Sequence, residues 1–335
     1  MDSMDSRRIT LATKPGASLA VNTYTPDNPT SLPLPLSKTL IVFLNGLAAP
    51  QTSWKPTLTI LLQHHKPSLP ALLTYDRYGQ GASDPDPTDP PDTPYGHDAD
   101  TVISDLHQLL SQACRDTLRL PPPGTNDSAT THLIFICNSI GCPLARLYAA
   151  AHPGTVPAFL FLDSMMANSD FVSVFPDPDA ADLDPTTLPR DVSVRDLRHA
   201  REQYGARFHP TVPNGEGLDR RDLPRRLPFA DGPVLPPGPD GRPPLVRVVG
   251  HDFERFARDG LEGPMAIPVA VTMAYMNPAW HEYNRGLCRL SAREGSSKEP
   301  IVAEGCGHLI QKDSPEFVAE QVVKLLESLC DAASA

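Results

Sequence analysis

Apolar runs of strand length alternate with amphipathic stretches along much of the chain. Unbroken apolar runs are typical of strands that are buried on both faces of a parallel sheet. Such runs predict strands at 39–44, 71–75, 132–137, 158–162, 268–273 and 301–303. Two further β-prone runs, 8–13 and 18–23, flank the turn sequence Lys14-Pro-Gly-Ala17 and predict an opening hairpin.

The segments between these runs have the period of helices. Residues 99–113 place Val102, Leu106 and Leu109 on one face, and residues 140–151 follow a predicted strand directly. A last helix is predicted over 315–329, with Ser314 at its N-cap. Alternation of strands and helices predicts an α/β fold with a doubly wound, mostly parallel sheet.

The alternation stops between residues 164 and 267. Only 244–249 has the pattern of a buried strand there, and 14 of the chain's 39 prolines fall between Pro176 and Pro244. We therefore predict a stiff, loop-rich cap inserted over the carboxyl edge of the sheet, where ligands bind in open α/β sheets. The predicted division is a core at 1–163, a cap at 164–267 and a second part of the core at 268–335.

Composition and charge exclude several classes of function. A net charge of −11 disfavours binding to nucleic acid, which relies on clustered Lys and Arg. No apolar run approaches the roughly 18 residues of a membrane span. The six cysteines form no C-x-x-C pair, and no His or Cys pair has metal-ligand spacing in a suitable context. We expect a cytoplasmic protein with free thiols and with no metal, cofactor, nucleic-acid or membrane partner.

The strongest local signal for chemistry is Cys137-Asn-Ser-Ile-Gly141, which joins a predicted strand to a predicted helix. It matches the nucleophile elbow G-x-S-x-G, with Cys137 in the first glycine position. Small residues flank such a serine because the tight turn brings neighbouring elements very close. For an isolated S-x-G, a helix N-cap role for Ser139 would be the simpler interpretation.

Three more motifs accompany the elbow in the order of a known superfamily. They are Leu44-Asn-Gly-Leu47 after a strand, Asp76-Arg-Tyr-Gly-Gln-Gly-Ala-Ser-Asp84, and Gly305-Cys-Gly-His308 followed by Asp313-Ser-Pro315. With these motifs the chain resembles the α/β-hydrolase superfamily over about its first 165 and last 65 residues. The resemblance implies an eight-stranded, mostly parallel sheet flanked by helices, with an inserted cap.

The resemblance also implies residue roles. Ser139 is then the nucleophile and His308 the general base, while the backbone N–H groups of Leu47 and Ile140 form the oxyanion hole. Asn45 stands where the superfamily usually has histidine, a change that matters less for a hole built from main-chain donors.

The acid that orients the histidine is the hardest member to assign from sequence. Superfamily order places it between serine and histidine, usually after the seventh strand. That place, 275–283, has Asn277 where an aspartate is expected. Asp163, after the sixth strand, occupies the position that some members use, and we prefer it. Asp163 could instead cap the turn that follows, and Glu282 and Asp252 remain as substitutes.

A serine nucleophile favours acyl transfer to water over the chemistry of superfamily members that attack with aspartate. We expect hydrolysis of a carboxylic ester or lactone of a medium-sized, largely apolar small molecule, with Asn45, Met165, Tyr275 and Trp280 at the substrate. Two alternatives remain open: a ligand-binding or degenerate protein without turnover, and a C–C hydrolase or lyase that uses the same triad. Besides the substrate, the partner considered is a second copy of the chain in a homodimer.

Overall fold

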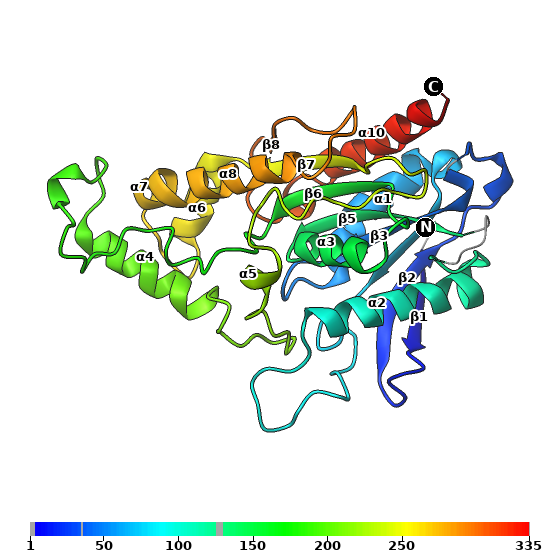
Figure 1. Cartoon of the computed structure of the whole chain (residues 1–335), viewed down its shortest axis with the longest axis horizontal. Coiled ribbons are helices and arrows are strands. Elements are labelled where there is room, and N and C mark those ends of the chain that lie inside the picture. Colours follow the sequence, from blue (N-terminus) through cyan, green and yellow to red (C-terminus); the bar gives the residue numbers. More distant parts are fainter. Residues whose placement is uncertain (1–3, 35, 125–129, 335) are drawn as a thin grey trace.

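Eight strands form one sheet through the middle of the molecule (Figure 1). The computed structural model describes residues 4–34, 36–124 and 130–334. The strands are β1 Asp5–Thr10, β2 Ser18–Tyr24, β3 Thr39–Leu44, β4 Ala71–Tyr75, β5 His132–Ser139, β6 Ala158–Ser164, β7 Leu245–His251 and β8 Ile301–Ala303.

The order of the strands across the sheet is β1-β2-β4-β3-β5-β6-β7-β8. β2 runs antiparallel to both β1 and β4, and all other neighbours are parallel. The opening hairpin is therefore confirmed. The carboxyl ends of β3, β5, β6 and β7 lie at one edge of the sheet, where the segments that follow these strands meet.

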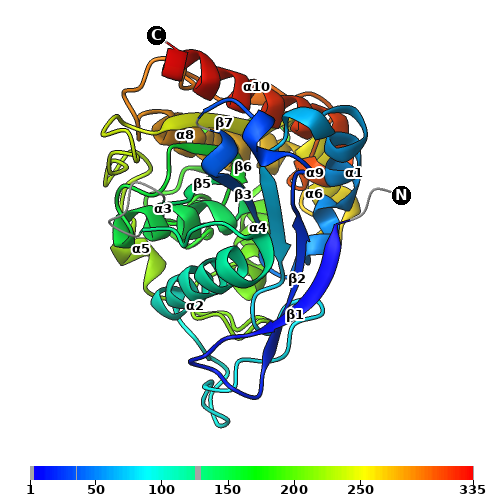
Figure 2. The ribbon, with the colours of Figure 1, turned by 90° about the vertical axis from the view of Figure 1, so that its right-hand side faces the viewer.

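Helices cover both faces of the sheet (Figure 2). Along the chain the α-helices are α1 Lys55–His64, α2 Ala99–Ala113, α3 Gly141–Ala151, α4 Val194–Arg207, α5 Leu223–Arg226, α6 Phe253–Glu262, α7 Val269–Val271, α8 Asn277–Cys288, α9 Ile310–Asp313 and α10 Pro315–Ser334. α2 packs beside α3 on one face, and α1 packs beside α10 on the other. Within the described ranges, no helix is both long and apolar enough to cross a membrane.

Strand residues alternate between the two halves of the core. Leu40 and Val42 of β3 pack with α2 and α3, whereas Ile41 and Phe43 pack with α1 and α10. All six residues of β3 are buried. An unbroken apolar run is what such a strand requires, because both of its faces are covered.

The strand predicted at 268–273 is wrong. This segment is helical, from α7 through a wider helical turn over Thr272–Met276 and directly into α8. An apolar run as short as this one has no periodicity that separates a strand from a helix. Here no turn residue stands between the run and α8, so the helix continues.

β7, at Leu245–His251, takes the place in the sheet that was predicted for 268–273. Part of the range predicted as a cap, 164–267, is therefore core sheet. The residues between β6 and β7, 165–244, form a long insertion that contains α4 and α5. Figure 1 shows α4 beside α6 and α7, at the end of the molecule beyond the carboxyl edge of the strands. We call residues 165–244 the insertion.

Candidate active site

Ser139 stands at the sharp turn between β5 and α3. Its φ is +55°, a left-handed conformation that non-glycine residues adopt at a cost of about 1–3 kcal/mol. The turn is tight because α3 begins close to β3: a Cβ on Gly141 would lie 2.5 Å from the carbonyl oxygen of Leu44. The elbow predicted from sequence thus has a physical basis, since only glycine fits at position 141.

Asn138, next to Ser139, ties the elbow to the loop that carries His308. Its side-chain amide donates to the carbonyl oxygens of Leu162 (3.0 Å) and His308 (3.1 Å). Its side-chain oxygen accepts from the Gln311 amide at 3.1 Å. One buried side chain thereby fixes the distance between the β5 turn, the end of β6 and the loop before α9.

Asp163 lies at a bulge near the end of β6. Asn138 pairs with Leu162 and Ser139 pairs with Ser164, so Asp163 is the extra residue on its strand. It has a φ of +45° and is fully buried. The bulge turns the Asp163 carboxylate out of the regular alternation of the strand and toward two histidines.

The Asp163 carboxylate accepts hydrogen bonds from both of these histidines. The Nδ1 of His308 lies 2.6 Å from Oδ2, and the Nδ1 of His251 lies 2.9 Å from Oδ1. The Nε2 of His251 faces the side-chain oxygen of Asn277 at 3.2 Å, and the Asn277 amide nitrogen donates to the Phe253 carbonyl. Both ring nitrogens of His251 therefore face acceptors, which is the hydrogen-bond pattern of a protonated imidazolium.

Charges within this cluster shift the pKa values of Asp163 and His251. Burial alone would raise the pKa of Asp163, but the positive charge and hydrogen bonds of His251, together with His308, hold it well below its usual range. Burial alone would lower the pKa of His251, but the Asp163 carboxylate raises it. The two groups form a buried ion pair beside His308.

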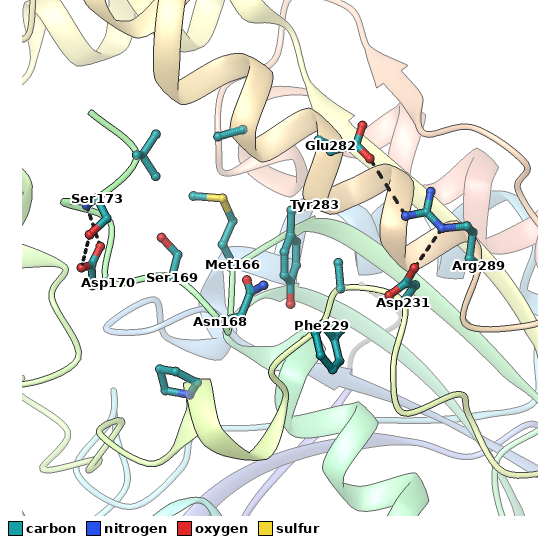
Figure 3. Close-up of a pocket in the computed structure, with 14 residues that line it drawn as sticks. Met166, Asn168, Ser169, Asp170, Ser173, Phe229, Asp231, Glu282, Tyr283 and Arg289 are labelled. Carbon is teal, nitrogen blue, oxygen red and sulfur yellow. Dashed lines mark hydrogen bonds and ion pairs between the residues drawn. The ribbon is translucent and has the colours of Figure 1, made fainter. Parts of the chain in front are cut away.

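The two other acids considered from sequence lie elsewhere. Glu282 lines a separate cavity of about 660 Å³, where it faces Arg289 (Figure 3) and pairs with Arg285 at 2.8 Å. Asp252 caps α6, because its carboxylate accepts from the backbone N–H groups of Arg255 and Gly305. Of the three candidate acids, Asp163 is the one whose hydrogen bond to His308 the structure contains.

Ser139 and His308 line one cavity of about 580 Å³. Its wall is largely apolar and includes two residues expected at the substrate, Met165 and Trp280. The Trp280 indole donates to the Ser164 carbonyl at 2.8 Å, which holds its ring 5.2 Å from that of His308. Leu47, expected in the oxyanion hole, also lines the cavity.

Two further residues expected at the substrate do not line this cavity. Asn45 is buried, and its side chain bonds to the Tyr75 carbonyl, the Gln80 amide oxygen and the Trp54 indole. Its role is to fix the start of the loop after β3. Tyr275 packs its ring against Phe175 in the insertion. Sequence position placed both near the site, but packing turned their side chains away from it.

A network of hydrogen bonds and one ion pair holds the loop after β3, residues 45–49, in place. The sequence did not indicate this network. Glu216 of the insertion is buried, and it accepts from the Ala48 N–H, the Gln80 amide (2.8 Å) and the Arg77 guanidinium. Arg77 also donates to the carbonyl oxygens of Asn45 and Gly46, at 2.8 and 2.9 Å. The insertion thereby clamps the loop that contains Leu47. Only Arg77, within the Asp-Arg motif, gave any signal in the sequence.

Ile140, the second residue expected in the oxyanion hole, precedes the first residue of α3. The N-terminus of a helix has backbone N–H groups without intrahelical partners and carries a partial positive charge. An N–H at this place can stabilise an oxyanion that develops beside Ser139.

One group of side chains has the composition of a metal site. Asp86, Asp89 and His97 bring ligand atoms within 4.8 Å of one another. The Lys14 ammonium, however, pairs with Asp86 and lies 2.6 Å from Asp105, and His97 hydrogen-bonds Asp89. These side chains already neutralise one another, and they lie apart from the cavity that Ser139 lines.

A family model described as the alpha/beta hydrolase family matches residues 41–321. The chain belongs to the alpha/beta hydrolase family. Its sheet, its elbow and the histidine loop before the last helix are the features expected of a member. No curated protein matches the chain.

Solved structures of hydrolases resemble the molecule along its whole length. A mutant epoxide hydrolase from Vigna radiata has a TM-score of 0.54 and 12% identity, covering 98% of this chain and 100% of the other. An esterase from Thermogutta terrifontis has a TM-score of 0.53 and 15% identity, covering 97% of this chain and 98% of the other. The alpha/beta hydrolase domain-containing protein 10 from mouse has a TM-score of 0.52 and 13% identity, covering 97% of this chain and 99% of the other. At these identities the likeness concerns the fold.

Proposed function

We propose that the protein is a serine hydrolase that cleaves a carboxylic ester or lactone through an acyl-enzyme on Ser139. The observation that carries the proposal is the 2.6 Å hydrogen bond between His308 and Asp163 at the cavity that Ser139 lines. Because Nδ1 of His308 faces Asp163, Nε2 is the ring nitrogen left to take a proton from Ser139.

The proposed reaction has two halves. Oγ of Ser139 attacks the ester carbonyl carbon, His308 takes the hydroxyl proton, and the N–H groups of Leu47 and Ile140 stabilise the oxyanion. His308 then gives this proton to the departing alcohol, which leaves an acyl-enzyme. Water attacks the acyl carbon with His308 again as base, and the acid departs as Ser139 recovers its proton. Asp163 keeps the ring oriented and stabilises its charged form.

Size and polarity of the cavity support a medium-sized, largely apolar substrate. A volume of about 580 Å³ lies within the usual range for small-molecule pockets. Phe171, Phe256 and Met265 contribute apolar wall beside Trp280. Epoxide hydrolases are among the structural relatives, but the elbow of this chain presents a hydroxyl, which supports acyl transfer.

The proposal is tested with p-nitrophenyl esters of increasing acyl length and with simple δ-lactones followed by pH-stat titration. The wild-type protein should hydrolyse at least one series, Ser139→Ala should lose that activity, and the control Ser328→Ala, on α10, should keep it. A wild-type protein that binds these compounds without turnover, or cleaves only C–C bonds in 1,3-diketones, would contradict the proposal and favour one of the other two functions.

A further inference from the structure

Charged side chains are unevenly distributed around the cavity that Ser139 lines. The lining contains three cationic residues, Arg207, Arg220 and Lys312, and two acidic ones, Asp259 and Asp313. What matters for a ligand is which of these charges already have a partner of opposite sign, because a paired charge attracts little further.

Both carboxylates are already paired. Arg255 approaches Asp259 at 2.8 Å and Asp313 at 3.9 Å, and Asp313 also accepts from the Gly307 N–H at 2.8 Å. Arg255 does not itself line the cavity, so it neutralises the two carboxylates without presenting its own charge to a ligand there. Little negative charge is left for a ligand to meet on this side.

The three cations differ from the acids in this respect. Among the described residues, no carboxylate lies within 4.0 Å of Arg207, Arg220 or Lys312, and Lys312 is an exposed residue. Within the part of the chain that the structure describes, Arg207 donates to Gln203 alone. Arg220 is 3% exposed, and its partners among residues 4–34, 36–124 and 130–334 are neutral carbonyl oxygens, those of Phe208, His209 and Val212.

Arg220 is the most informative of the three. Its carbonyl contacts fix the chain just after α4, which explains its position but leaves its charge uncompensated by direct contact. Its Nε has no hydrogen-bond partner among the described residues, and burial lowers the pKa of the guanidinium, as expected for a cation taken out of water. Glu216 and Asp219 act on Arg220 from a distance, but each of them is paired more closely with another arginine. A buried cation of this kind is stabilised by a nearby anion.

The insertion contributes six residues to the lining: Met165, Phe171, Tyr204, Arg207, Phe208 and Arg220. Four of them are apolar or aromatic, two are guanidinium groups, and none is acidic. Phe208 links the two arginines, because it follows Arg207 in the chain and its carbonyl accepts from Arg220. The part of the wall that the insertion supplies is therefore apolar and positively charged.

We propose that the cavity selects an ester or lactone that carries an anionic group, most simply a carboxylate, which Arg207 and Arg220 recognise at the insertion wall. This inference rests on the proposed hydrolase function and adds a substrate class to it. The apolar part of such a substrate packs on the aromatic side chains that line the same cavity. Guanidinium groups suit the task because they bind carboxylates with paired N–H donors.

The test compares substrates that differ only in this charge. Mono-p-nitrophenyl adipate carries a free carboxylate on its acyl chain, and its methyl ester is the neutral match. A second pair, the butyrate esters of 4-hydroxybenzoate and of methyl 4-hydroxybenzoate, places the carboxylate on the leaving group. Each kcat/KM is divided by the rate of hydroxide hydrolysis of the same compound, which removes intrinsic reactivity.

In at least one pair we expect the anionic compound to be preferred by about tenfold or more at low salt. The preference should decrease as ionic strength rises, because Arg207 is exposed and salt screens it. Arg207→Gln should reduce the preference roughly three- to tenfold, the range for loss of one partly screened charged contact. Arg195→Gln, an exposed position on the same helix that does not line the cavity, serves as the control and should leave the preference unchanged.

The outcomes separate this inference from the proposed function. Hydrolysis of both members of each pair with equal normalised kcat/KM would overturn the anionic selectivity while leaving the hydrolase intact. An equal loss of preference in the Arg195 and Arg207 variants would also overturn it, because the effect would then be one of net charge. No hydrolysis of any of the four compounds, or of the unsubstituted esters, would contradict the proposed function itself.

Discussion

His251 offers a test of the buried ion pair beside the candidate active site. The substitution His251→Gln keeps a side-chain N–H that can reach Asp163, but it removes the positive charge. His251 is 3% exposed and Asp163 is fully buried, so solvent screens their interaction little. The variant leaves the buried Asp163 carboxylate with His308 and N–H groups as its remaining partners.

The size of the effect follows from this burial. Removing one partner of a buried ion pair costs about 3–5 kcal/mol, because the remaining charge is left uncompensated. The glutamine retains one hydrogen bond, which is worth roughly 1 kcal/mol. We therefore expect the free energy of unfolding to fall by about 2–4 kcal/mol at the pH where the pair is fully charged.

The loss should depend on pH in a defined direction. The folded-state pKa of His251 is raised, so its contribution is complete below its unfolded pKa of about 6.5 and is lost as the pH rises through the folded value. The folded-state pKa of Asp163 is lowered, so its contribution is present above about 3.9 and is lost as the pH falls. The difference between wild type and variant should be largest between about pH 4 and 6.5.

Urea unfolding at pH 5.5 and at pH 9, followed by circular dichroism, measures this difference. The control is His64→Gln, an exposed histidine at the end of α1, which should change stability little at either pH. A loss of the same size at pH 5.5 and pH 9 would refute the charged state assigned to His251. No loss at either pH would refute the ion pair altogether.

Three further predictions concern the elements around Ser139. Asp163→Asn should lower kcat by about 10⁴-fold, because a neutral amide no longer fixes the tautomer of His308; kinetics with an ester that the wild type cleaves measure this. Glu216→Gln should lower kcat by about 10- to 100-fold, with a smaller change in KM. This loss of kcat is smaller than the ~10²–10³-fold loss expected when an oxyanion donor is removed outright. Equal changes in kcat and KM would argue against a clamp on the loop that contains Leu47. Gly141→Ala should destabilise the fold by roughly 1–3 kcal/mol in urea unfolding, because its Cβ would lie 2.5 Å from the Leu44 carbonyl oxygen; unchanged stability would mean that the elbow is looser than the structure has it.

The central strands were predictable because burial on both faces leaves an unbroken apolar run. Residues 39–44 and 71–75 match β3 and β4 residue for residue. The same signal failed at 268–273, where a partly buried helical segment has an apolar run of equal length. The true seventh strand, β7, has the pattern of a buried strand at 244–249, but it directly follows a proline-rich stretch and we assigned it to the cap.

Within the candidate site, the sequence predicted those residues whose unusual backbone conformation belongs to a recognisable motif or position. Ser139 and Asp163 both adopt positive φ at the ends of neighbouring strands, and their order along the chain indicated their places. Glu216 and His251 had no such signal. Glu216 meets Arg77 across 139 positions of sequence, and His251 meets Asp163 across 88. Contacts of this kind are set by how the insertion and β7 pack, which no local pattern records.

The most direct test of the proposed mechanism is whether Ser139 becomes acylated during turnover. Rapid mixing with a p-nitrophenyl ester that the protein hydrolyses, quenching in acid within milliseconds, and intact-mass and peptide analysis would detect the intermediate. We expect one acyl group per chain, on the peptide that contains Ser139, and a burst of p-nitrophenol where deacylation is the slower step. Hydrolysis with the acyl group on another residue, or hydrolysis at the wild-type rate in Ser139→Ala, would contradict the proposed mechanism.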